Sequence, residues 1–241
     1  MSFLLGASQL RSLLGTVAAS LRLSATSVAS PSSASAVSML AAVATRLVQV
    51  RELPLSAALL GALLQAVAPV LALPAATHAS FAALYALLHA LVTHAALPAH
   101  LLDALPLLTR ALTALAHAAL RHTLTLSAGL AAEATSAAAH SEETSEVALA
   151  MRLVGELRAA LGDRLRKYAP YLLAELVQAV TRQAVPRSVR ALVNGACFEL
   201  MDVCTRHEHA MLFAALSPAA QAVYRALHGE YEHEHRFKGK V

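Results

Sequence analysis

Histidine is the side chain of this sequence with the widest chemical range, and it occurs 12 times in 241 residues. Two short runs, RHEH at 206–209 and EHEH at 232–235, place imidazoles beside carboxylates. Both groups are zinc ligands, but neither run has the H-E-x-x-H spacing with which a helix holds a catalytic metal. Side chains two residues apart on a helix point about 200° away from each other. The histidines within one run therefore cannot share an ion.

A different spacing places three polar residues on one helical face. His228, Glu232 and His235 stand at positions i, i+4 and i+7. This arrangement leaves a metal-dependent helical enzyme open as an alternative, which elemental analysis of the purified protein would decide. A solvated polar face opposite Tyr224 and Tyr231 accounts for the same spacing without an ion. We therefore expect no metal site.

The two cysteines, Cys197 and Cys204, lie seven residues apart on one predicted helix. That spacing corresponds to about 10.5 Å along the helix axis, too far for a disulfide. We expect two reduced, buried thiols. Cys204 and His207 could supply two zinc ligands, but no second pair follows at a suitable spacing.

Sequence motifs that hold nucleotides or activate a nucleophile are missing from the chain. Neither G-x-x-x-x-G-K-S/T, nor G-x-G-x-x-G, nor G-x-S-x-G occurs. The adjacent acids Glu142 and Glu143 stand at a predicted helix start, where negative charge complements the helix dipole. We expect no catalytic residue, no cofactor and no small-molecule substrate. The residues instead favour a helical interaction module.

The C-terminal tail combines three cations with one aromatic ring, in Arg236, Phe237, Lys238 and Lys240. Such a composition can contact phosphates and stack on a base. A basic helix end that complements the negative end of the dipole accounts for the same residues and is the simpler interpretation.

The elements that must position these residues are helices. Ala and Leu fill 102 of the 241 positions (56 and 46), charged residues make up 14%, and aromatic residues 4%. Ala and Leu are strong helix formers, whereas the residues that favour strands are scarce. This composition excludes a disulfide scaffold, a collagen and a disordered polyampholyte, and it disfavours a β-sandwich or a Rossmann sheet.

Residues 53–102 contain no Asp, Glu, Lys or Arg, so an organelle or membrane-associated protein anchored through this stretch is an alternative to a packed helical protein. Prolines and histidines interrupt the stretch, and polar side chains are costly in hydrocarbon. These interruptions favour packed helices. Residues 1–51 are rich in Arg and Ser and contain no acid, a pattern typical of import into a mitochondrion or plastid.

The apolar periodicity predicts an all-α chain of helical pairs, arranged as an irregular α-solenoid of HEAT or armadillo type or as a helical bundle. Ser-rich and Ala-rich stretches divide it. We expect an N-terminal helix and a Ser/Ala/Pro linker at 1–38, an Ala/Leu-rich helical region at 39–126, a low-complexity bridge at 127–145 and a C-terminal helical domain at 146–241.

The C-terminal string VRALVNGACFELMDVC at 189–204, together with the residues after it, resembles the C-terminal domain of the Urb2/Npa2 family of nucleolar pre-ribosomal-RNA processing proteins. The resemblance is good over 165–241, weak from 146 and absent upstream. Phe237 departs from it, standing where that family often has Trp. The matching positions are Gly195, Leu200, Asp202, Cys204, His207, Leu227, Tyr231, Lys238 and Lys240.

This resemblance implies a non-enzymatic helical scaffold in pre-rRNA processing and assembly of the large ribosomal subunit. Its location would be the nucleolus, and its partners would be other pre-ribosomal assembly factors, with precursor rRNA as a further candidate. Members of the family are usually far longer, which implies either a fragment or a compact version. The residues we expect to contact a partner or RNA are Arg190, Asp202, Arg206, Arg225, Tyr231, Arg236, Phe237, Lys238 and Lys240.

Overall fold

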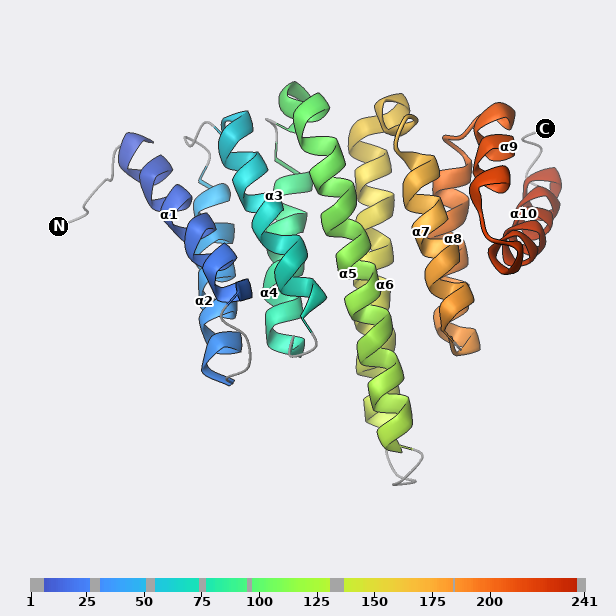
Figure 1. The fold of residues 1–241 in the computed structure, drawn as a ribbon, viewed down its shortest axis with the longest axis horizontal. Coiled ribbons are helices and arrows are strands. Elements are labelled where there is room, and N and C mark those ends of the chain that lie inside the picture. Colours follow the sequence, from blue (N-terminus) through green and yellow to red (C-terminus); the bar gives the residue numbers. More distant parts are fainter. Residues whose placement is uncertain are drawn as a thin grey trace. The chain divides into compact units, whose positions relative to one another are not determined.

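A computed structural model describes residues 7–26, 31–50, 55–73, 77–94, 97–130, 137–183 and 185–237. Over these ranges the secondary structure consists of ten α-helices and two short 3₁₀ helices, without a strand (Figure 1). The expected all-α fold is therefore confirmed. The chain divides into two compact units, Met1–Thr125 and Leu126–Val241, and each is described by itself.

The first unit holds α1 (Ala7–Thr26), α2 (Pro31–Val48), α3 (Ala57–Ala72), α4 (His78–Val92), η1 (Leu97–His100) and most of α5 (Leu101–Leu130). Its helices alternate between two layers. α1 packs along α3, and α2 packs along α4, so that α1 and α3 stand in front of α2 and α4 in Figure 1. Such layering of consecutive antiparallel helices is that of an α-solenoid.

Leucines and small alanines build the core of this unit. Phe81, Leu84 and Leu88 of α4 and Leu63 of α3 are completely buried. Polar groups close the helix ends. Thr77 and Ser80 form a capping box at the start of α4, and Arg121 of α5 donates from Nη2 to the Leu71 carbonyl of α3 at 2.6 Å. These bonds satisfy backbone groups that a helix end leaves unpaired.

Two stretches that we expected to lack regular structure are partly helical. The linker expected up to residue 38 is interrupted at Pro31, where α2 begins. Proline suits the first turn of a helix, and Val37 and Ala41 bury the face that follows. The bridge expected over 127–145 is similarly shortened, because α5 continues to Leu130 and α6 begins at Ala137. In α2, the apolar residues that follow along the helix outweigh the low helix propensity of Ser.

The uncharged stretch at 53–102 folds into short helices. α3 has 16 residues and α4 has 15, whereas a membrane span needs about 20. Among the described residues, we find no helix with the length and hydropathy that would let it cross a bilayer.

The second unit contains α6 (Ala137–Leu161), η2 (Gly162–Leu165), α7 (Ala169–Arg182), α8 (Arg187–Met201), α9 (Arg206–Ala215) and α10 (Pro218–Phe237). α8 packs against α6 and α7, and α7 also contacts α9 and α10. Gly162 has a φ of +51°, a conformation that favours glycine, and it turns the chain from α6 into η2. The buried centre includes Leu153, Leu157, Leu173 and Leu200.

Candidate functional site

The segment between α8 and α9 holds several of the residues that the sequence singled out. Helical spacing predicts that one helix continues through Cys204 and that Asp202 and Arg206 pair along it at positions i and i+4. The structure corrects this expectation: α8 ends at Met201, and α9 begins at Arg206. A capping box explains the break, because Glu208 accepts from the Thr205 backbone amide at 2.6 Å while Thr205 caps the Glu208 amide.

Asp202 lies directly after the end of α8 and connects this helix to α6 and α10. Its Oδ2 accepts from Nη2 of Arg158 on α6 at 2.9 Å, and its Oδ1 accepts from the Tyr231 hydroxyl on α10 at 2.9 Å. Arg158 also pairs with Glu199 of α8. Burial and the Asp202 carboxylate raise the pKa of Tyr231 to about 12, so Tyr231 stays a hydrogen-bond donor. Two of the expected partner contacts, Asp202 and Tyr231, are thus engaged within the unit.

A second bridge holds α9 in place. Arg166, at the end of η2, contacts both carboxylate oxygens of Glu208 at 3.2 and 3.3 Å. Hydrogen bonds from Thr205 and the contact with Arg166 lower the pKa of Glu208. The carboxylate therefore remains charged, and it serves as cap and ion-pair partner together. The carboxylate of the run at 206–209, which suggested metal chemistry, thus anchors the start of α9.

The cysteines are both free thiols, Cys197 buried within α8 and Cys204 half-buried after it. Burial raises the pKa of each thiol to about 12. Because the thiolate is the reactive form, we expect iodoacetamide near neutral pH to label the folded protein about a thousandfold more slowly than free cysteine. Mass spectrometry would follow the reaction, with guanidinium-unfolded protein as the control. Rapid labelling of folded Cys197 would contradict the burial described here.

Aromatic rings gather where α9 meets α10. The Tyr224 hydroxyl is hydrogen-bonded to Nδ1 of His209, and the His209 ring lies 5.1 Å from that of His228 in an edge arrangement. Phe213 of α9 also contacts Tyr224, at 6.3 Å between ring centroids. The guanidinium of Arg225 covers Phe213, 5.3 Å from its ring centroid. Arg225, another expected partner contact, therefore has an intramolecular cation–π role as well.

This cluster makes the second unit sensitive to acid. Burial, and then the neighbouring charge of His228, lower the pKa of His209 below its ordinary value of 6.5. Below that pH the unfolded chain binds a proton that the folded chain does not, so stability falls as the pH falls from 6.5 toward the folded pKa. We expect His209→Gln to flatten the dependence of the unfolding free energy on pH by up to about one proton.

Urea denaturation at several pH values, followed by far-UV circular dichroism, measures this slope. His207→Gln is the matched control, because His207 is an exposed histidine of the same helix. Its slope should equal that of the wild type. If His209→Gln kept the full wild-type slope as well, the assignment of acid sensitivity to His209 would be wrong.

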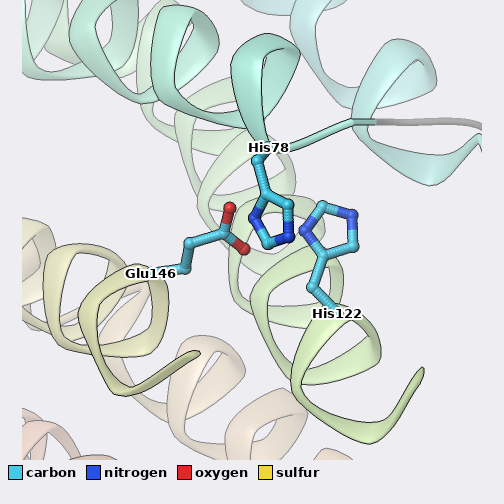
Figure 2. Close-up of side chains that lie close together, drawn as sticks. All are labelled: His78, His122 and Glu146. Carbon is cyan, nitrogen blue, oxygen red and sulfur yellow. The ribbon is translucent and has the colours of Figure 1, made fainter. Parts of the chain in front are cut away.

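Two further histidine arrangements bear on metal binding. His228 Nδ1 lies 3.7 Å from Glu232 Oε1, while the side chain of His235 lies outside the described residues. The expectation that this polar face lies opposite Tyr224 and Tyr231 is wrong at His228, whose ring lies 5.9 and 6.1 Å from theirs, because positions i, i+4 and i+7 share one helical face. In the first unit, His78 of α4 and His122 of α5 place their ring centroids 5.2 Å apart. Figure 2 shows these two imidazoles together, and it also labels Glu146, which belongs to the second unit. A pair of imidazoles supplies fewer ligands than the three or four of a protein zinc site.

The remaining predicted contact residues differ in placement. Arg190 and Arg206 are exposed and have no ion pair within the described ranges. Arg236 and Phe237 end α10, but their side chains lie outside the described residues, as do Lys238 and Lys240 entirely. The structure thus brings Asp202 and Tyr231 together and leaves Arg190 open to a partner. It adds the contacts of Arg158 with Asp202 and of Tyr224 with His209, which sequence spacing did not predict.

The polar residues of the second unit thus connect its helices to one another, and the described residues of both units form an all-α protein. A family model described as the Urb2/Npa2 family matches residues 37–240. The chain belongs to this family. The resemblance that we placed at 165–241 and called absent upstream of 146 in fact extends much further toward the N-terminus. No curated protein and no solved structure matches the chain.

Membership gives the chain a role in ribosome biogenesis, in a family that acts in the nucleolus and is not known as enzymatic. The resemblance to this family that the C-terminal string showed is therefore confirmed. The organelle alternative that we drew from the N-terminal composition has no support in these comparisons.

Proposed function

We propose that this chain is a non-enzymatic scaffold that binds other pre-ribosomal assembly factors during pre-rRNA processing and assembly of the large ribosomal subunit. The observation that carries the proposal is the family match over residues 37–240. The geometry supports it, because the motif residues Asp202 and Tyr231 link helices to one another, and Glu208, which is not one of the matching positions, links α9 to Arg166. A scaffold needs such a rigid arrangement of helix faces.

Precursor rRNA is a further partner within the same proposal. The cations of the tail, Arg236, Lys238 and Lys240, have the charge to contact phosphates. Nuclease treatment distinguishes binding to protein partners from binding to RNA. Binding through assembly factors survives digestion of exposed RNA, whereas binding through RNA alone does not.

Sedimentation of nuclear extract from cells that express the tagged full chain tests the proposal. We expect the protein to sediment with large pre-ribosomal particles, and to stay with assembly factors after nuclease digestion. The tag expressed alone is the control and should remain at the top of the gradient. If the tagged chain sedimented only as a free protein, the scaffold proposal would fail.

A further inference from the structure

A groove lies in the second unit, where α7 ends beside α8 and α10. Its volume is about 570 Å³. Val180 of α7 and Leu227 of α10 form a buried apolar floor, and Val223 is half-buried beside them. Ala222 and Ala226 are small exposed residues of the α10 wall. The groove therefore offers apolar surface and enough room for the side chains of another polypeptide.

Positive charge predominates among the charged side chains that line the groove. Arg182 and Arg190 are both exposed at it. Arg190 has no hydrogen bond or ion pair within the described part of the chain, and Arg182 donates only to the neutral Gln178 side chain, at 2.8 Å. The acid of the lining, Glu230, accepts from the Asn194 amide at 3.1 Å. Two cations thus face the groove without a carboxylate partner.

A third lining residue presents an unused acceptor. Oε1 of Gln183 is buried and has no hydrogen-bond partner among the described residues. A buried polar atom without a partner is unfavourable, and an N–H group of a bound molecule would satisfy it. The groove therefore combines an apolar floor, two available guanidinium groups and one acceptor.

We propose that this groove binds an acidic amphipathic segment of a partner protein. Apolar side chains of the segment would cover Val223 and Leu227, a carboxylate would pair with Arg190, and an N–H donor would reach Gln183. Aromatic residues, on which bases would stack, do not occur in the groove lining, and its apolar floor suits the apolar side chains of a peptide. The inference rests on the proposed scaffold function and names the chemistry of the partner.

Fluorescence anisotropy with the full chain and two labelled model peptides tests this inference. One peptide carries Leu at helical i, i+3, i+4 and i+7 spacing with Glu elsewhere, and its twin carries Lys in place of Glu. We expect the Glu peptide to bind, and Arg190→Glu to weaken its binding about tenfold while strengthening binding of the Lys twin. Arg187→Glu is the matched control, because Arg187 is exposed on the same helix but does not line the groove.

Several outcomes would overturn the inference. They are no binding of the Glu peptide, equal effects of Arg190→Glu and Arg187→Glu, or displacement of the Glu peptide by a single-stranded RNA. If the chain self-associated in the absence of peptide, and Arg190→Glu abolished this self-association, the groove would be assigned to a second copy of the chain instead. If the peptides bound as expected but the tagged chain did not sediment with pre-ribosomal particles, the inference about the groove would hold and the scaffold proposal would fail.

Discussion

Replacement of Tyr224 by alanine should lower the free energy of unfolding of the second unit by about 3–5 kcal/mol. Tyr224 is 3% exposed, and its ring contacts those of His209, Phe213 and His228. Its removal leaves a cavity at the contact between α9 and α10. It also takes away the hydroxyl that is hydrogen-bonded to His209, which leaves a half-buried imidazole without that partner.

Tyr224→Phe separates these two effects, because it keeps the ring and removes only the hydroxyl. We expect this variant to lose about 1 kcal/mol. Urea denaturation followed by far-UV circular dichroism measures both variants, and Tyr171→Ala is the control because Tyr171 is an exposed ring of α7. If Tyr224→Ala were no more destabilised than Tyr171→Ala, the ring cluster would not hold the two helices together.

The apolar faces of the helices could be predicted from sequence, whereas the partners of their polar residues could not. Val189, Val193 and Leu200 recur at helical spacing and are all buried in α8. Arg158 and Asp202 are 44 residues apart, and a hydrogen bond over that distance depends on how α6 packs against α8. Helical spacing within one segment cannot reveal such a pair, so it suggested Arg206 as the partner of Asp202.

The end of α8 was missed for a different reason. The string at 201–205 contains no Pro or Gly, and the apolar stripe continues to Cys204, so periodicity alone extends the helix. The local signal that ends it is Thr205 followed three residues later by Glu208, a capping-box pattern. In the Ala/Leu-rich first unit the opposite problem arises, since a composition so uniform hides the family pattern that extends to residue 37.

Loss of the Asp202 carboxylate should destabilise the second unit by about 1–2 kcal/mol, measured on Asp202→Ala by urea denaturation. An exposed ion pair contributes about 0–1 kcal/mol, but Asp202 serves two donors from different helices, Arg158 and Tyr231. The Asp202 and Arg158 side chains are 18% and 31% exposed, so water screens the pair only in part. Arg158 keeps Glu199 as an ion-pair partner in this variant. The loss of stability is therefore smaller than it would be if Arg158 were left without any carboxylate partner.

A double-mutant cycle isolates the bond between Asp202 and Tyr231. Asp202→Ala and Tyr231→Phe should together cost less than the sum of the single variants, by about 0.5–1 kcal/mol, because each already removes the same hydrogen bond. Asp163→Ala is the control for a lost acid, since Asp163 is exposed and forms no side-chain ion pair in the described ranges. Strict additivity would mean that Asp202 does not join α8 to α10. The motif acid would then have to act outside the folded unit, as a contact for a partner.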